Sequence, residues 1–429
     1  MTPRPYVPTF EGMAAKRKPP IRAIIHASKL YTGAGFRKRD GRRVQDADRG
    51  VIDDGALVYE KGGKILWCGR TKDIPSRYAR APKQNLRNLQ AVTAGFVDCH
   101  THLVFAGDRS DEFARRCGGE SYESIAASGG GILATVRATE AASEKDLLAL
   151  ASARVREASA WGTRVLEIKS GYGLAMDVEL RLLRVMTRLK KAHPEMTFHR
   201  TFLGAHAVPK GVSKTEYVEE ILEKVLPVVA KEKLADSCDV FVDKGYFDSE
   251  DARKILGAAR KRGLHARLHA DELGNTESTA LGVELGALSV DHLLCVSDRS
   301  IEALAASNTV GVLLPGTAFY LKAAYAPARK LIDRGACIAL ATDFNPGTSM
   351  TLSLPAVMTI AALYCQMSRA EILAAVTYNA AKALGLEKSH GTLEPGYASV
   401  FTVLPFATFE ETYYRFAWAP KLTAPSAKR

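Results

Sequence analysis

The feature of this sequence that most constrains its fold is an eightfold alternation of short apolar runs with longer helical stretches, beginning near residue 95. Each run has the length of a strand, and most are followed by a segment with helical periodicity. Strands separated by helices pair in parallel, and eight parallel strands close most readily into a barrel. We therefore expect an α/β fold built on a (β/α)8 TIM-like barrel. The expected strands are Phe96–His102, Arg164–Lys169, Phe198–His206, Cys238–Val242, His265–His269, Leu288–His292, Thr309–Leu314 and Cys337–Asp343.

Helix-start signals support this alternation. At several places a Ser or Asp precedes a helical stretch and an acidic residue follows three positions later, which is typical of a side chain that caps the first turn. These pairs are Ser143 with Asp146, Ser213 with Glu216, Asp248 with Asp251, and Ser368 with Glu371. A doubly wound open sheet is the alternative fold, but no G-x-G-x-x-G motif follows a strand where that fold would need one.

Segments of β character flank the barrel. Residues 56–60 and 64–68 predict a hairpin, because Gly62 and Gly63 can supply the positive φ angles of a tight turn. A strand at 398–403 should return to the N-terminal β region. We expect three parts, which are 1–92 as an N-terminal arm and part of a composite β-sandwich, 93–387 as the barrel, and 388–429 as the C-terminal part of the sandwich.

The chain is basic, with 59 Lys and Arg against 47 Asp and Glu and a formal net charge of +12. This balance favours anionic partners, which include nucleic acids, lipid surfaces and carboxylate substrates. The basic residues are dispersed apart from two clusters near the start, so we expect no nucleic-acid partner.

Seven cysteines are scattered without a C-x-x-C pair, which is typical of reduced thiols in a cytosolic protein. No apolar run approaches the roughly 18 residues of a transmembrane helix, and the Pro-rich start does not resemble a signal peptide. We expect a cytoplasmic protein with no membrane partner, and a homodimer as the commonest oligomeric state.

Candidate metal ligands follow several of the expected strands. His100 and His102 stand at i and i+2 directly after an apolar run, so both side chains should leave a strand on the same side. A chance pair of this kind occurs in roughly one such sequence in five. Three later strands end with further candidates, which are His269, Asp291-His292 and Asp343. Because barrel enzymes place their chemistry at the C-terminal ends of strands, these side chains should meet on one rim.

Three histidines and one aspartate make a ligand set that suits Zn²⁺ or Fe²⁺ with one open position for water. The expected ligands are His100, His102, His269 and Asp343. Such an ion lowers the pKa of the water toward neutrality. Asp343 can also accept the proton of the water, Glu272 can shuttle protons or hold a substrate N–H, and His292 can polarise a carbonyl oxygen. This set describes hydrolysis of a C–N bond in a cyclic amide or amidine.

These residues resemble the motifs of the amidohydrolase superfamily across most of residues 56–396. The shared motifs are D-C-H-T-H at 98–102, H-A-D-E at 269–272, D-H at 291–292 and D-F-N-P-G at 343–347. More narrowly, the chain resembles the imidazolonepropionase family. The motifs that carry this likeness are L-V-F-A-G-D-R at 103–109, G-G-G-I at 129–132, K-S-G-Y-G at 169–173 and G-A-H at 204–206.

The resemblance implies hydrolysis of 4-imidazolone-5-propanoate to N-formimidoyl-L-glutamate in histidine degradation. It implies a small-molecule substrate with a carboxylate, which the guanidinium fork of Arg109 would bind. The other implied substrate or product contacts are Tyr172, His206, Glu272, Asn345, Gly347 and Thr348. Some superfamily members hold two metals through a lysine on the fourth strand. Here Lys244 lies just outside that strand and Lys169 lies on the second, so we expect one Zn²⁺ or iron ion (Fe²⁺ or Fe³⁺) per chain.

The sequence departs from the family at Glu140, where arginine is expected, and at 398–400, where Ala-Ser-Val replaces Ala-Asp-Leu. These positions bear on oligomer contacts and domain packing rather than on chemistry. Two other functions stay open. One is deamination of a nitrogen heterocycle, against which Arg109 argues because such bases carry no carboxylate. The other is a basic nucleic-acid-binding or anion-binding protein with a vestigial metal site.

Overall fold

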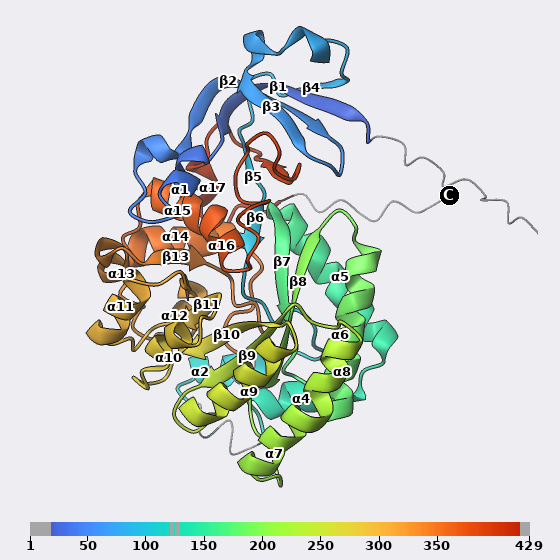
Figure 1. The fold of residues 1–429 in the computed structure, drawn as a ribbon, viewed down its shortest axis with the longest axis vertical. Coiled ribbons are helices and arrows are strands. Elements are labelled where there is room, and N and C mark those ends of the chain that lie inside the picture. Colours follow the sequence, from blue (N-terminus) through green and yellow to red (C-terminus); the bar gives the residue numbers. More distant parts are fainter. Residues whose placement is uncertain (1–18, 121–123, 125–128, 421–429) are drawn as a thin grey trace, which may run out of the picture.

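The barrel is the larger of two parts that the computed structural model describes, over residues 19–120, 124 and 129–420 (Figure 1). Eight parallel strands are hydrogen-bonded in the order of the sequence, which confirms the expected TIM-like fold. The barrel strands are β6 (Phe96–Asp98), β7 (Thr163–Lys169), β8 (Thr197–Ala205), β9 (Ser237–Val242), β10 (His265–Ala270), β11 (Ser289–His292), β12 (Val310–Leu313) and β13 (Cys337–Leu340).

Helices connect these strands and surround them. In the first half of the barrel they are α2 (Ser110–Cys117), α4 (Ile132–Ala141), α5 (Glu144–Ala160), α6 (Met176–Ala192), α7 (Lys214–Glu220) and α8 (Leu226–Lys231). In the second half they are α9 (Ser249–Lys261), α10 (Ser278–Glu284), α11 (Asp298–Ala305), α12 (Pro315–Leu321), α13 (Ala328–Arg334), α14 (Leu354–Tyr364), α15 (Arg369–Ala375) and α16 (Tyr378–Lys382).

The predicted helix starts are confirmed. The side chains of Ser143, Ser213, Asp248 and Ser368 each accept a hydrogen bond from the backbone N–H three residues later. Each bond satisfies one of the backbone donors that the first turn of a helix leaves unpaired.

The first and last barrel strands are shorter than predicted, because β6 ends at Asp98 and β13 at Leu340. Asp343 has a φ of +50°, outside the β region of backbone conformation, and it turns the chain at the rim. Two backbone hydrogen bonds join the segments beyond these strands: Asp343 N–H donates to the His100 carbonyl at 3.0 Å, and His102 N–H donates to the Phe344 carbonyl at 2.9 Å. These bonds close the barrel at the level of the candidate ligands.

A mixed sheet of six strands lies at the N-terminal end of the barrel strands (Figure 1). Its strands are β1 (Ile21–Tyr31), β2 (Val51–Glu60), β3 (Ile65–Arg70), β4 (Lys83–Asn85), β5 (Val92–Ala94) and β14 (Phe401–Val403). The C-terminal strand β14 pairs antiparallel with β5, so both ends of the chain contribute to one sheet. In the β2–β3 turn only Gly62 has a positive φ, so Gly63 is not needed in the way predicted.

Two shorter helices, α1 (Ala34–Lys38) and α17 (Glu411–Tyr414), accompany this sheet. The limits of the three expected parts stay a prediction, and residues 1–18 of the expected arm lie outside the described residues. No helix in the described part of the chain is long and apolar enough to cross a membrane.

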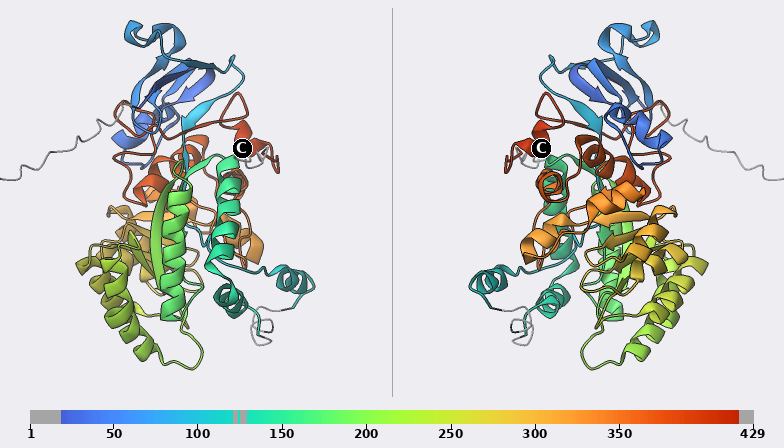
Figure 2. Two further views of the ribbon diagram at one scale, coloured as in Figure 1. Left: turned by 90° about the vertical axis from the view of Figure 1, so that its right-hand side faces the viewer. Right: turned by 90° about the vertical axis from the view of Figure 1, so that its left-hand side faces the viewer.

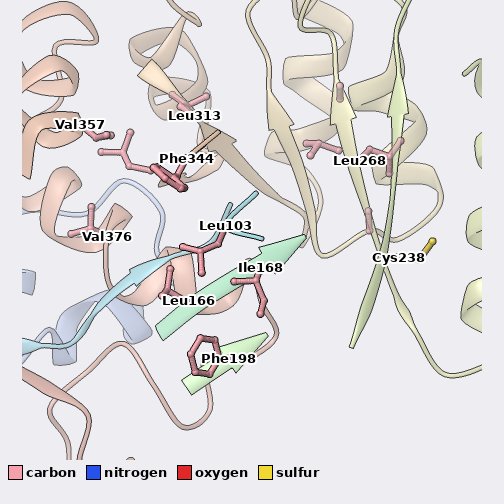
Figure 3. Close-up of a cluster of buried hydrophobic side chains, with 14 of the residues drawn as sticks. Leu103, Leu166, Ile168, Phe198, Cys238, Leu268, Leu313, Phe344, Val357 and Val376 are labelled. Atoms are coloured by element: carbon pink, nitrogen blue, oxygen red, sulfur yellow. The ribbon is translucent and has the colours of Figure 1, made fainter. Parts of the chain in front are cut away.

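Apolar side chains of the barrel strands pack against the surrounding helices, as Leu268 does beside Gly282 of α10. Figure 3 shows the apolar layer, in which Leu166, Ile168 and Leu268 are fully buried. On the same strands, charged side chains alternate with these residues and are also fully buried, among them Glu167, Lys169 and Arg267. Charged groups are costly to bury unless they are paired, so Glu167, Lys169 and Arg267 must have charged or hydrogen-bonding partners inside the barrel.

Candidate active site

Four histidines and one aspartate converge at the C-terminal rim of the barrel. The Nε2 atoms of His100 and His102 lie 3.5 and 3.4 Å from Oδ1 of Asp343. The ring of His269 lies 4.6 Å from that of His100, centroid to centroid, and 5.2 Å from that of His292. All five side chains are buried, and their ligand atoms form two overlapping groups compact enough to hold a metal ion.

Buried carboxylates orient two of these rings. His100 Nδ1 lies 2.6 Å from Asp291 Oδ2, and His269 Nδ1 lies 3.1 Å from Asp239 Oδ2. Carboxylates only accept hydrogen bonds, so each Nδ1 carries the proton and each Nε2 faces the centre of the site. Both Nε2 atoms are buried and have no hydrogen-bond partner among the described residues. A metal-ligating histidine is typically held in this way by a carboxylate behind it.

Protonation of the rings differs with their surroundings. Burial, with the nearby charge of Lys169, holds the pKa of His100 well below its ordinary value, and burial does the same for His102. Burial would also lower the pKa of His269, but the Asp239 carboxylate raises it above the ordinary value. His269 therefore holds a proton more readily than His100 and His102 do.

The orienting carboxylates belong to a buried ionic network that the sequence analysis missed. Lys169 Nζ lies 2.7 Å from Asp239 Oδ2 and 2.9 Å from Glu167 Oε1. Arg267 donates to Asp291 Oδ2 at 3.0 Å and to the backbone carbonyls of Ala383 and Cys99, both at 2.7 Å. Burial would lower the pKa of Lys169, but Asp239 and Glu167 raise it. The available signal was a charged residue inside an otherwise apolar strand.

A cavity of about 480 Å³ opens beside these histidines. Most of the residues that the resemblance implied lie on its wall, and apolar side chains complete it. The lining residues are His102, Arg109, Ile132, Tyr172, His206, Phe241, Tyr246, His269, Glu272, Leu273, His292, Leu321, Asp343, Asn345 and Thr348. A volume of this size suits a small molecule.

Gly347 does not line the cavity, but it lies against the guanidinium group of Arg109. A Cβ added to Gly347 would stand 2.1 Å from Nη1 of Arg109, so a larger residue there would displace the guanidinium from its present position. Arg109 directly precedes helix α2, and its Nε–H donates to Glu112 Oε2 at 2.8 Å. The side chain of Arg109 is only 8% exposed, although it reaches the wall of the cavity.

The loop after β7 places Tyr172 and His206 side by side. Gly171 has a φ of +110° and its carbonyl accepts a hydrogen bond from His206 Nδ1 at 2.9 Å. Burial lowers the pKa of His206 to about 3, so the ring is neutral and its Nε2 is a free acceptor. The buried Glu179 carboxylate accepts the N–H groups of Gly171 and Gly173, and it holds this loop in place.

Glu272 and His292 form a second pair across the cavity. His292 Nδ1 lies 3.4 Å from Glu272 Oε1, and His292 has a φ of +83°, a strained conformation for a non-glycine residue. The carboxylate of Asp243 accepts the Glu272 N–H at 2.9 Å and so fixes the turn after β10. Burial raises the pKa of Glu272 to about 8 and lowers that of His292 to about 3. At 3.4 Å the pair is slightly beyond direct hydrogen-bond distance, and His292 Nδ1 has no hydrogen-bond partner among the described residues.

The Asn345 side chain makes hydrogen bonds within its own loop. Its amide nitrogen donates to the Asp343 carbonyl at 2.7 Å and to Thr348 Oγ1 at 2.9 Å. Its oxygen accepts the N–H groups of Gly347 and Thr348, both at 2.8 Å. Asn345 therefore shapes the loop that follows Asp343.

Comparison with known proteins agrees with this geometry. The model of the amidohydrolase family matches residues 91–417. Two solved structures share the fold: an adenosine deaminase from Xanthomonas campestris with bound zinc (16% identity, TM-score 0.67, 92% of this chain and 87% of that chain) and the Escherichia coli guanine deaminase (15%, 0.65, 89% and 88%). At these identities the likeness shows the fold alone.

Curated relatives are far more similar in sequence. The imidazolonepropionase of Porphyromonas gingivalis strain ATCC 33277 is 41% identical over 395 residues, which cover 92% of this chain and 93% of that protein. The imidazolonepropionase of Bdellovibrio bacteriovorus is 44% identical over 378 residues, with 87% and 88% covered. That of Symbiobacterium thermophilum is 43% identical over 391 residues, with 90% and 91% covered. The chain therefore belongs to the amidohydrolase family and, within it, to the imidazolonepropionase family.

Proposed function

We propose that this enzyme hydrolyses the cyclic amide C–N bond of 4-imidazolone-5-propanoate, with one water, to N-formimidoyl-L-glutamate in histidine degradation. The observation that carries this proposal is the pairing, within one cavity, of a cluster of unpartnered imidazole nitrogens with a buried guanidinium. The imidazoles suit a hydrolytic metal, and the guanidinium suits the carboxylate of the propanoate arm.

The residues at the rim fit a single Zn²⁺ or iron ion held by His100, His102, His269 and Asp343. The buried Nε2 atoms of His100 and His269 have no hydrogen-bond partner among the described residues, which is the state expected of ligand atoms. A bound ion supplies Lewis acidity, which polarises a carbonyl and lowers the pKa of a water. We propose one ion because Lys169 is already paired with two carboxylates of the neighbouring network, Asp239 and Glu167.

Asp343, Glu272 and His292 are proposed to handle protons and the developing charge. Asp343 Oδ2 accepts the Thr317 hydroxyl at 2.6 Å, which leaves Oδ1 facing the histidines and available to accept a proton from the attacking water. The Glu272 carboxyl can deliver a proton to the ring nitrogen that leaves, and it can hold a substrate N–H. A neutral His292 can donate one hydrogen bond to the carbonyl oxygen.

Residues of the cavity wall are proposed to bind the propanoate carboxylate at one end of the substrate and the imidazolone ring at the other. Arg109 would bind the propanoate carboxylate through its Nη1 and Nη2 groups, because Glu112 already occupies Nε–H. Tyr172 and the Nε2 acceptor of His206 lie beside His102, where the imidazolone ring would sit. Thr348 lines the cavity directly, while Asn345 and Gly347 shape the loop around the product.

The remaining expectations are part of the same proposal. We propose a cytoplasmic enzyme, since all seven cysteines are unpaired, that forms a homodimer and has no nucleic-acid partner.

Ultraviolet loss of freshly generated imidazolone propanoate tests this function, with metal-replete enzyme compared with chelator-treated enzyme. We expect turnover that the chelator abolishes and that added Zn²⁺ or Fe²⁺ restores. Enzyme shown to carry metal that leaves the compound intact, but releases ammonia from guanine, would refute the proposal in favour of a deaminase.

A further inference from the structure

Helix α2 begins directly after Arg109, which lines the cavity. The helix lies at the edge of the molecule, where it is drawn in teal in Figure 2, and buries none of its own residues. Arg109, Glu112 and Arg116 are spaced at i, i+3 and i+7, so they share one face. Arg116 donates to the Gly347 carbonyl at 3.1 Å. Polar contacts rather than apolar burial therefore fix this helix against the site.

Glu112 connects two separate walls of the cavity. Its Oε2 accepts the Arg109 Nε–H at 2.8 Å, and its Oε1 accepts the Gly131 N–H at 3.1 Å. Gly131 has a φ of +71° and directly precedes Ile132, which lines the cavity. The Glu112 side chain is only 13% exposed, so water competes little for these bonds.

The guanidinium of Arg109 is thus restrained on two sides. Glu112 holds its Nε edge, and Gly347 lies against Nη1 so closely that a Cβ there would stand 2.1 Å away. A planar guanidinium that is fixed at Nε presents its two Nη groups in one orientation. A carboxylate needs both groups in that orientation for a bidentate bond.

We propose that Glu112 is a positioning residue that sets the preference of the cavity for a substrate with a carboxylate. The inference rests on the proposed function, because it assumes that Arg109 meets that carboxylate. Two effects of Glu112 have opposite signs. Its charge opposes a second carboxylate near Arg109, whereas its hydrogen bond holds the guanidinium in the binding orientation. The orientation effect dominates, because the Glu112 carboxylate lies behind Nε and the substrate would approach the Nη edge.

Binding measurements with two stable probes separate these effects. The probes are 3-(imidazol-4-yl)propanoate and its primary amide, which share the ring and arm but differ in charge. The wild-type enzyme should bind the acid at least about tenfold more tightly than the amide. Glu112→Ala should weaken binding of the acid about tenfold, leave binding of the amide unchanged, and raise KM rather than lower kcat for imidazolone propanoate. Glu112→Gln keeps an oxygen acceptor for Nε–H and should recover most of the affinity.

Glu120→Ala is the matched control, because Glu120 lies just beyond the C-terminal end of the same helix and pairs only with Arg115 and Ser124 among the described residues. It should change neither affinity. Unchanged or tighter binding of the acid by Glu112→Ala would overturn the inference, and so would an equal loss for acid and amide. A wild-type enzyme that binds both probes alike would refute the Arg109 contact itself. Turnover is scored separately, so failure of the proposed reaction is distinguished from failure of the positioning role.

Discussion

Replacing Asp239 with asparagine separates the orientation of a ligand from the integrity of the fold. Asp239 lies 3.1 Å from His269 Nδ1 and 2.7 Å from Lys169 Nζ, and it is fully buried. Burial would raise the pKa of Asp239, but His269 and Lys169 hold it well below its ordinary value. The variant therefore removes the negative charge between His269 and Lys169 and replaces one of the two acceptor oxygens with an NH2 donor.

Two magnitudes follow from these contacts. Loss of the carboxylate behind a ligating histidine lowers metal affinity about 10–100-fold. Breaking one side of a buried ion pair costs about 3–5 kcal/mol, and we expect about 3 kcal/mol because Lys169 keeps Glu167 at 2.9 Å. Metal affinity is measured by competition with a coloured chelator, and stability by urea unfolding of the metal-free protein.

Asp236→Asn is the comparison variant for this experiment. Asp236 directly precedes β9, at the opposite end of that strand from the site, and pairs with Arg200, so its loss should lower stability without changing metal affinity. If Asp239→Asn binds metal as tightly as the wild-type enzyme, the argument that this carboxylate orients His269 is wrong. A loss of affinity that Asp236→Asn reproduces would contradict it equally, since stability alone would then explain the effect.

Three further predictions follow from the same site. Asp343→Asn should abolish turnover while circular dichroism and thermal unfolding of the metal-free protein stay close to wild type, and residual activity above one-tenth of kcat would exclude Asp343 as the proton acceptor. Arg109→Ala should raise KM with little change in kcat, by about 2–4 kcal/mol of lost charged hydrogen bonding, and an unchanged kcat/KM would refute the carboxylate contact. In the metal-free protein, burial raises the pKa of Glu272 from 4.5 to about 8, so the folded state holds this proton more tightly than the unfolded state. Its stabilisation is therefore complete below pH 4.5 and lost as the pH rises through 8, and urea unfolding from about pH 5 to about pH 9 should show a loss of stability that Glu272→Gln lacks.

The sequence identified the parts of this site that local patterns encode. Strand length, helix caps and the position of polar residues at strand ends are local properties, so they predicted the barrel and brought His269 and Asp343 to the same rim as His100. The lengths of the first and last strands were wrong, because the positive φ of Asp343 has no signature in an apolar run.

Ion pairs between side chains on different barrel strands could not be predicted from local sequence patterns. Nothing near Asp239 in the sequence indicates that it lies against Lys169, which is 70 positions away. A charged residue within a strand has the same appearance whether it faces solvent or a buried partner. Glu112 was missed for a related reason, since its bond to Arg109 is local but its bond to Gly131 spans 19 positions. The roles of the individual site residues stay predictions.

The contact between the segments that follow β6 and β13, the seam of the barrel, joins parts of the chain that are far apart in sequence. Asp98 accepts the Thr342 hydroxyl across 244 positions of sequence, and the two backbone bonds next to it involve His100, His102 and Asp343. An ion bound by residues from both sides of this seam would act as a cross-link that closes one of the longest loops in the protein. Such a cross-link restricts the unfolded chain more as the loop lengthens. The same ligands that place an ion for hydrolysis would then also tie the beginning of the barrel to its end.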